Sequence, residues 1–284
     1  MDISKIVMKQ LKLGRSIQAE DYYLLPTIEG YRSFFRKGNR KEREEVFEAE
    51  VAEKIILHLK YRAGMNVGER RRAQLGSFSI HDEGRDYRFR VSTVGDFMQK
   101  ESLVLRFLHS FEEKACLYFD DSQIQEIQRH LLKRGLFLFS GPTGSGKTTS
   151  MFQLALSLNK NQMISIEDPV EIENKAVLQL QVNEAIGMTY EALIKLCLRH
   201  RPDIVFVGEI RDEITLRSVI RATLTGHTVF STLHAKNVEG VKARLIELGA
   251  TREELKICLG GIVYQRLLED VAGDVRALFE AVIY

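Results

Sequence analysis

The sequence predicts an α/β protein of two domains, and three observations lead to this prediction. Residues 1–110 show short strand-like segments around one helical pattern, which is typical of a small α+β domain. Residues 123–284 begin with apolar strands separated by helices, which indicates a parallel sheet covered on both faces. A glycine-rich loop follows the first of these strands. Residues 111–122 are the expected linker.

In the first domain, Val46, Val51, Ile55 and Leu59 recur at helical spacing and predict a helix over residues 41–61. The expected strands cover residues 21–25, 31–36, 76–81, 85–93 and 103–108.

In the second domain, Asp120, Asp121 and Ser122 are expected to open a helix. The expected strands then cover residues 136–140, 163–167, 204–208 and 228–232, and the helices between them cover residues 147–158, 189–200 and 214–224.

The net charge of +2 is small but unevenly distributed. Residues 1–110 carry 21 Lys and Arg against 16 Asp and Glu, a balance of +5, and the remainder carries 20 against 23, a balance of −3. A balance of +5 does not by itself argue for nucleic-acid binding. No stretch approaches the roughly 18 consecutive apolar residues of a spanning helix, and nothing resembles a secretory signal. We therefore expect a soluble protein whose membrane contact is at most peripheral.

The three cysteines, Cys116, Cys197 and Cys258, are widely separated and lie in apolar contexts. This pattern excludes a disulfide framework and offers no CxxC pair for zinc. We expect small buried side chains in a reducing cytosol, and no zinc.

A phosphate-binding motif follows the strand over residues 136–140 and opens the next helix. Its glycines lack Cβ atoms, so that backbone N–H groups can wrap a phosphate closely. The helix aims its positive dipole end at the anion. Lys147 is expected to reach the β- and γ-phosphates, and the Thr148 hydroxyl to bind Mg²⁺. The motif GxxxxGK[ST] is matched by Gly141, Pro142, Thr143, Gly144, Ser145, Gly146, Lys147, Thr148 and Thr149.

Three further polar groups follow strands of the same expected sheet. In such sites the strand on the Mg²⁺ side usually ends in Asp, but Gly208 occupies that position here. We therefore expect Glu209 to be the carboxylate that contacts Mg²⁺ through water, and also to orient the attacking water. Glu167 closes another strand and should point to the same edge. Taken alone, an acidic strand end is usually solvated surface. His234 ends a Ser-Thr-x-His run and could sense the γ-phosphate, although a lone histidine there is more often structural.

In this order, these boxes resemble those of the secretion and type IV pilus assembly ATPase superfamily. Residues 141–149 resemble its phosphate loop and residues 166–171 its acidic box. Residues 201–212 resemble its glycine-glutamate Walker B box and residues 226–234 its histidine box. The resemblance implies a RecA-like P-loop ATPase domain that hydrolyses ATP with Mg²⁺.

The resemblance extends into the first domain. Residues 69–76 resemble the family's ERRxPQDGR turn, and residues 89–93 and 103–106 its two arginine-bearing strands. The family works as a hexameric ring in which the small domain packs on a neighbour's catalytic domain and supplies arginines to the γ-phosphate. The matching residues here are Arg90 and Arg106, with Arg70, Arg71 and Arg72 matching less well. Without the resemblance, these arginines would be interpreted as solvated strand faces.

Three departures from the family pattern matter. The ASDIHxEP motif is degraded over residues 19–26, and the zinc-binding tetracysteine insertion is missing after residues 260–268. We also expect the protein to lack the long N-terminal docking domain of many members. The chain therefore resembles most the short, zinc-free members of Gram-positive competence systems. This implies a cytoplasmic homo-hexamer at the inner face of the cell membrane. It would act with an inner-membrane pilus platform protein to assemble a competence pseudopilus for DNA uptake, without binding nucleic acid directly.

Three alternatives stay open. The chain could be a retraction ATPase of the same superfamily, which the sequence distinguishes poorly from an assembly ATPase. A nucleic-acid translocase is disfavoured by the modest charge and by the absence of a surface that combines aromatic and basic residues. A scaffold that binds nucleotide but hardly hydrolyses it is disfavoured by the intact Lys147 and Glu209.

Overall fold

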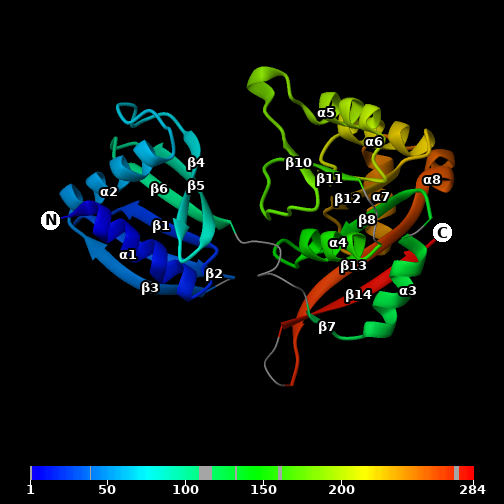
Figure 1. The fold of residues 1–284 in the computed structure, drawn as a ribbon, viewed down its shortest axis with the longest axis horizontal. Helices are drawn as coiled ribbons and strands as arrows, with labels where there is room; N and C mark the ends of the chain where they lie inside the picture. Colours follow the sequence, from blue (N-terminus) through cyan, green and yellow to red (C-terminus); the bar gives the residue numbers. More distant parts are fainter. Residues whose placement is uncertain (1, 39, 109–116, 132, 159–161, 272–274) are drawn as a thin grey trace. The chain divides into compact units, whose positions relative to one another are not determined.

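The computed structural model describes residues 2–38, 40–108, 117–131, 133–158, 162–271 and 275–284. The chain divides into two compact units, residues 1–109 and 110–284 (Figure 1). Leu117–Tyr118 (β7), within the range expected to be a linker, pairs with the sheet of the second unit. Residues 111–116 of that range, with Cys116, lie outside the described residues.

The first unit is an antiparallel sheet with two helices packed on one face (Figure 1). Val7 and Leu11 of one helix and Ile55 and Leu59 of the other pack against buried strand residues such as Phe89. Its helices are α1 (Ile3–Ser16) and α2 (Ala49–Arg62), and its strands, in chain order, are β1 (Asp21–Pro26), β2 (Tyr31–Lys37), β3 (Arg40–Phe47), β4 (Gln74–Asp82), β5 (Arg85–Gly95) and β6 (Glu101–Leu108). The order across the sheet is β3-β2-β1-β6-β5-β4.

The helix expected over residues 41–61 is wrong in its first third. Residues 40–47 form edge strand β3, paired with β2, and α2 begins only at Ala49. Val46, counted into the helical pattern, is exposed on β3. The segment is rich in charged helix formers, but pairing with β2 overrides that local preference, and charged side chains suit an exposed sheet edge. Helix α1 was not predicted; Val7 and Leu11 on it recur at helical spacing and are buried.

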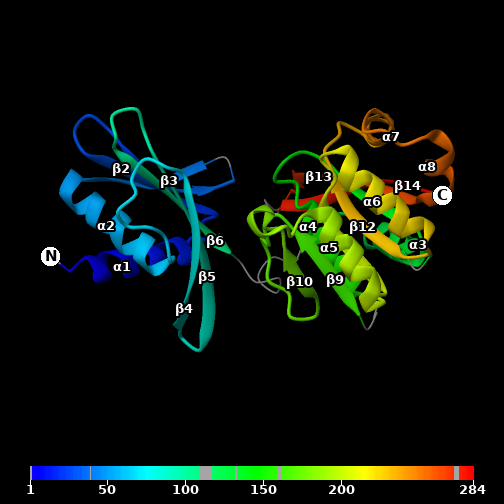
Figure 2. The ribbon, with the colours of Figure 1, turned by 90° about the horizontal axis from the view of Figure 1, so that it is seen from above.

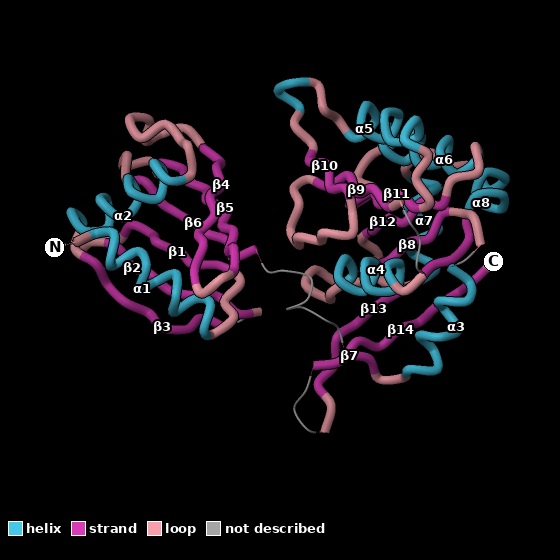
Figure 3. Tube along the Cα trace, viewed as in Figure 1, coloured by secondary structure: helices cyan, strands magenta, loops and turns pink. Residues whose placement is uncertain are grey.

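The second unit is an eight-stranded sheet with helices on both faces, as predicted (Figures 2 and 3). The apolar side chains of β8 alternate between the two faces. Leu138 packs with the core under α5 to α8, and Phe139 with the core under α3 and α4. The helices are α3 (Asp121–Leu131), α4 (Lys147–Leu156), α5 (Tyr190–Cys197), α6 (Glu213–Leu224), α7 (Val238–Glu247) and α8 (Arg252–Cys258), with short 3₁₀ turns at Glu184–Ile186 and Leu198–His200.

The sheet is mixed, so the prediction of a parallel sheet is wrong at one edge. Its remaining strands are β8 (Leu136–Ser140), β9 (Met163–Glu167), β10 (Leu178–Gln181), β11 (Ile204–Glu209), β12 (Thr228–Leu233), β13 (Leu259–Glu269) and β14 (Val275–Ile283), in the order β10-β9-β11-β12-β8-β13-β14-β7. Strand β14 runs antiparallel to β13. The outer part of β13 is exposed, so this pair of strands lacks the continuous apolar pattern of the inner strands.

Candidate active site

Four of the predicted boxes meet at one edge of the second sheet. Strands β9, β11, β12 and β8 are parallel neighbours in this order, and their carboxyl ends therefore lie at the same edge. Glu167 ends β9, Glu209 ends β11, His234 follows β12, and the glycine-rich loop follows β8. Ligands of open parallel sheets bind at such an edge.

The glycine-rich loop is built from backbone conformations that favour glycine. Gly141, Gly144 and Gly146 have φ angles of 146°, 77° and 79°. A Cβ atom on Gly141 would lie 2.1 Å from the backbone oxygen of Gln265 on β13. Gly146 is the N-cap of α4, so the first N–H groups of that helix open toward the loop. The loop therefore passes close to β13 and presents backbone donors, as an anion site requires.

Lys147 is the cation of this loop, and its side chain is held close to it. Its Nζ donates to the backbone oxygens of Gly141 at 3.1 Å and Pro142 at 2.8 Å. The residue is only 8% exposed. Burial lowers the pKa of Lys147, while the carboxylates of Glu209 and Glu171 oppose that shift. The ammonium therefore lies beside the loop, where burial weakens the solvent screening of its attraction for an anionic group.

A β-bulge at Gly208 sets the position of Glu209. In the pairing of β11 with β12, Val207 faces Ser231 and Glu209 faces Thr232, so Gly208 is the extra residue. A Cβ atom on Gly208 would lie 3.1 Å from the Tyr190 hydroxyl. The Ser231 and Thr232 hydroxyls donate to the backbone oxygens of Val207 at 2.6 Å and Gly208 at 2.7 Å. The Ser-Thr pair of the histidine box therefore holds the end of β11.

Two cationic or titratable side chains lie around the Glu209 carboxylate. Arg211 donates a hydrogen bond to it and lies 3.8 Å from Asp168. His234 Nε2 lies 3.9 Å from Glu209 Oε2. The pKa of His234 is lowered, first by partial desolvation and then by the Lys147 ammonium, while Glu209 opposes the shift. A neutral imidazole beside Glu209 and the loop can both accept and donate a hydrogen bond.

Glu167 is a buried carboxyl, 4% exposed, at the end of β9. Its Oε1 accepts hydrogen bonds from Ser165 Oγ at 2.6 Å and from Gln179 Nε2 on β10 at 3.0 Å. Burial raises the pKa of Glu167, and the two hydrogen bonds oppose that rise. A buried carboxyl at a strand end on the same sheet edge as the glycine-rich loop is a candidate functional group.

The predicted arginines lie together on the first unit. Arg90 on β5 and Arg106 on β6 face each other directly in the strand pairing. Arg106 Nε donates to Asp21 Oδ1 on β1 at 2.8 Å, and Asp21 is 4% exposed. Asp21 belongs to the degraded motif over residues 19–26, so one acidic residue of that motif has a definite partner. Arg70–Arg72 lie in the segment between α2 and β4.

The donors at the sheet edge fit a nucleotide phosphate group with Mg²⁺. The glycine cradle, the start of α4 and the buried Lys147 supply the donors and the positive charge. The buried Ser145 Oγ has no hydrogen-bond partner among the described residues. Thr148 lies on the first turn of α4, as a hydroxyl ligand of Mg²⁺ would. Within the described ranges, no cluster of three or more His, Cys, Asp or Glu side chains could hold a metal by itself.

Several residues at this edge were not predicted: Ser165, Gln179, Tyr190, Arg211 and Gln265. Their signal in the sequence is a polar residue inside an otherwise apolar strand, as with Ser165 and Gln265. Burial raises the pKa of the Tyr190 phenol, so it stays a neutral hydroxyl against Gly208. Cys197 and Cys258 are buried and free, as expected, and burial raises the pKa of the Cys197 thiol to about 11.

A family model described as "Type II/IV secretion system protein" matches residues 3–281. The chain belongs to this family.

Members of the type II/IV secretion family with closely similar sequences are competence proteins. The chain is 48% identical over 267 residues to competence protein ComGA of Streptococcus pneumoniae, which covers 94% of this chain and 85% of that protein. It is 32% identical to ComGA of Bacillus subtilis, over 94% of this chain and 76% of that protein.

Among solved structures, the pilus retraction motor PilT with bound ADP is similar, with 26% identity and a TM-score of 0.71. The match covers 97% of this chain and 82% of that one. The Legionella pneumophila ATPase DotB has the same fold, with a TM-score of 0.75 at 20% identity over 98% of this chain and 80% of that one. These matches confirm the predicted α/β fold with a small domain before an ATPase domain.

None of the helices that the structure describes has the length and apolar run of a membrane-crossing segment.

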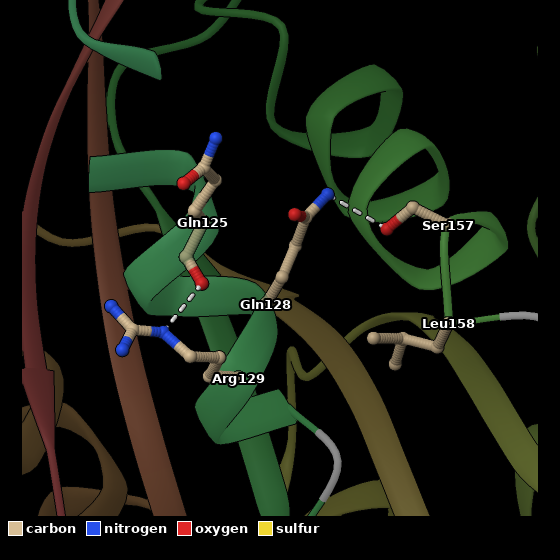
Figure 4. Close-up of a pocket in the computed structure, with 5 residues that line it drawn as sticks. All are labelled: Gln125, Gln128, Arg129, Ser157 and Leu158. Atoms are coloured by element: carbon tan, nitrogen blue, oxygen red, sulfur yellow. Dashed lines mark hydrogen bonds between the residues drawn. The ribbon is translucent and has the colours of Figure 1, made fainter. Parts of the chain in front are cut away.

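A pocket of about 580 Å³ lies between α3 and the end of α4, lined by Gln125, Gln128, Arg129, Ser157 and Leu158 (Figure 4). Gln128 Nε2 donates to Ser157 Oγ across it at 2.8 Å. Because α4 has ten residues, this pocket lies roughly 15 Å from the glycine-rich loop. It is therefore not part of the candidate active site.

We predict that Ser165→Ala raises the pKa of Glu167 further, and that Gln179→Leu raises it by a smaller amount. Each change removes one hydrogen bond that favours the carboxylate, and the bond from Ser165 has the larger effect. The pKa is measured by NMR titration of ¹³C-labelled glutamate carboxyls, with the Glu167 signal assigned from its loss in Glu167→Gln. Ser231→Ala is the control, because Ser231 donates to the Val207 backbone and not to Glu167. An unchanged pKa in Ser165→Ala would show that this bond does not tune Glu167.

Proposed function

We propose that this chain hydrolyses ATP, in the presence of Mg²⁺, as the motor that assembles a competence pseudopilus for DNA uptake. The observation that supports hydrolysis is the joint position of the glycine-rich loop, Lys147 and Glu209 at one sheet edge. The observation that favours the competence system is the 48% identity with competence protein ComGA over most of both chains.

The roles in hydrolysis are assigned by position. Backbone donors of residues 141–149 hold the phosphates, and Lys147 exchanges its two loop carbonyls for phosphate oxygens. Thr148 is the protein ligand of Mg²⁺, which neutralises charge on the phosphates when bound. Glu209 orients the attacking water and contacts the metal side through water. Glu167 assists as a second carboxylate, and His234 couples the γ-phosphate to the end of β12.

The arginines act from the first unit of a neighbouring subunit. Arg90 and Arg106 face each other on paired strands, and like charges placed directly opposite cost stability. Asp21 offsets part of that cost through its ion pair with Arg106. Two arginines opposite each other on adjacent strands are suited to bind a phosphate group of a nucleotide that another subunit holds. We therefore propose a homo-hexamer in which this pair completes the active site of the next subunit.

The motor is proposed to work at the cytoplasmic face of the cell membrane, on an inner-membrane pilus platform protein. A retraction motor is the second candidate, and the similarity to the pilus retraction motor PilT favours it. Assembly is preferred because identity is 48% with ComGA and 26% with PilT.

Lys147→Ala is predicted to remove most ATP hydrolysis without unfolding the protein, because it removes the cation of the loop.

Glu209→Gln keeps the shape of the side chain but loses the carboxylate charge. It should still bind ATP–Mg²⁺ and turn over about 10²–10⁴-fold more slowly. Phosphate release and nucleotide affinity are measured on both variants. Normal hydrolysis by Lys147→Ala, or lost affinity with a normal rate in Glu209→Gln, contradicts these roles.

A mixing experiment tests the arginine pair. The structure shows that Arg106→Ala alone would leave the buried Asp21 carboxylate without its partner, so the arginine-deficient subunit is Asp21→Asn/Arg106→Ala. This subunit and Glu209→Gln should each be inactive, since such an arginine is worth ~10³–10⁵ in rate. Their mixture should regain activity, because in mixed rings an intact Glu209 can share an active site with an intact Arg106 of the adjacent subunit.

The control for mixing is a subunit that carries all three changes, which should stay inactive with either partner. Tagged subunits establish that the two variants share a ring. If the two variants assemble into the same rings but hydrolysis does not recover, the proposal that an arginine acts across subunits is wrong.

Deletion of the gene separates the two filament functions. An assembly motor is required to build the filament, so the deletion strain should show no surface filaments and no DNA uptake. A retraction motor removes filaments, so its loss should leave them in excess. Filaments are counted by electron microscopy, with a Lys147→Ala strain as the control that keeps the protein present. Excess filaments in both strains would overturn the assembly role.

A further inference from the structure

Gln265 is a polar side chain in the apolar core beneath the glycine-rich loop. It lies on β13 directly after Tyr264, which pairs with Ser140 at the end of β8, and it is fully buried. Its cross-strand partner Phe279 and its neighbour on the same face, Val263, belong to the apolar core under α3 and α4. An amide is costly to bury among such side chains unless its hydrogen bonds are made.

Gln265 contacts the loop at two points. Its backbone oxygen lies against Gly141, where a Cβ atom would come within 2.1 Å. Its side-chain Nε2 donates a hydrogen bond to the backbone oxygen of Ser145. The other two loop carbonyls with side-chain donors, those of Gly141 and Pro142, receive Lys147. Strand β13 thus holds both the first residue of the loop and the residue before the α4 N-cap.

The second contact fixes a peptide plane. A trans peptide directs its C=O and N–H in opposite directions, so holding the Ser145 oxygen toward β13 turns the Gly146 N–H away from β13. Gly146 is the α4 N-cap in the left-handed conformation, and its N–H belongs to the donors expected for the phosphate. A carbonyl that rotated into the loop would instead present a negative dipole to an anion.

We propose that Gln265 is a positioning residue of the nucleotide site, which orients the Ser145–Gly146 peptide so that its N–H is available to the β-phosphate. The inference rests on the proposed nucleotide binding of the loop. Packing alone does not explain an amide at this position. Its Oε1 has no hydrogen-bond partner among the described residues, so an apolar side chain of the same size would remove one unpaired buried oxygen and thereby offset the cost of leaving the Ser145 carbonyl without its donor.

Two variants and one matched control test the role of Gln265. Gln265→Leu keeps the volume but leaves the Ser145 carbonyl without its donor. Gln265→Glu places a carboxylate oxygen against the same carbonyl. Val263→Ala removes core contacts from the same strand and face without touching the loop. Affinity for ADP–Mg²⁺ is measured by calorimetry, thermal stability by melting, and amide hydrogen exchange of residues 143–148 without nucleotide.

Gln265→Leu should weaken ADP–Mg²⁺ binding about tenfold, as expected for one hydrogen bond with a buried acceptor, and should speed exchange in the loop. Its melting temperature should stay close to the wild-type value or rise. Gln265→Glu should bind more weakly than Gln265→Leu, and Val263→Ala should melt lower but bind normally. Wild-type affinity and exchange in Gln265→Leu, or weakening that follows melting temperature in all three variants, would overturn the inference. Wild-type protein that does not bind ADP–Mg²⁺ would instead refute the proposed function.

Discussion

Strand β8 lies between β12 and β13 and runs parallel to both, and the candidate site depends on this arrangement. Parallel pairing brings the carboxyl ends of β8, β9, β11 and β12 to one edge, so residues nearly 100 positions apart become neighbours. Pairing with β13 places the Gln265 backbone oxygen directly against Gly141 at the start of the loop. The core on both faces of β8 makes the strand a rigid base. A loop that must hold an anion with backbone donors needs such a base, because small displacements of a peptide plane change the direction of its dipole.

The charges at this edge balance one another locally. Lys147 is buried and its pKa is lowered, Glu167 is buried and its pKa is raised, and Glu209 is bonded to Arg211. Burial thus shifts both pKa values toward the neutral forms of the two side chains. The carboxylates of Glu209 and Glu171 oppose the shift of Lys147, and hydrogen bonds from Ser165 and Gln179 oppose the shift of Glu167. Gly208 contributes by its lack of a side chain, which allows Tyr190 to approach and the bulge to turn Glu209.

Local pattern was enough to predict the inner strands and the loop. The apolar runs at β8 and β9 have five residues each, which is the length of a buried strand and too short for a helix. The glycines at 141, 144 and 146 have the spacing that a phosphate loop requires. The predicted helix over residues 41–61 was wrong for the residues up to Phe47, because their pairing with β2 makes them a strand. A run of charged residues does not by itself indicate an edge strand. Gln179 and Gln265 were missed for a related reason. A polar residue in a strand gives no sign of its partner, which lies on another element, 12 residues away for Gln179 and 120 residues away for Gln265.

The two arginines of the first unit that we propose to act on a phosphate have the sequence pattern of an ordinary exposed strand face. By sequence, Arg90 and Arg106 alternate with apolar residues as any half-exposed strand does, and only the resemblance singled them out. The structure adds that they are direct cross-strand neighbours, and that Asp21, the partner of Arg106 on β1, is almost completely buried. A buried carboxylate costs free energy unless a cation stays with it, so Asp21 holds the Arg106 guanidinium at one place on the sheet. An arginine fixed in this way loses less conformational entropy when it meets a phosphate than a free surface arginine would. Preorganisation of this kind is what a residue needs if it is to act on a ligand bound by another subunit.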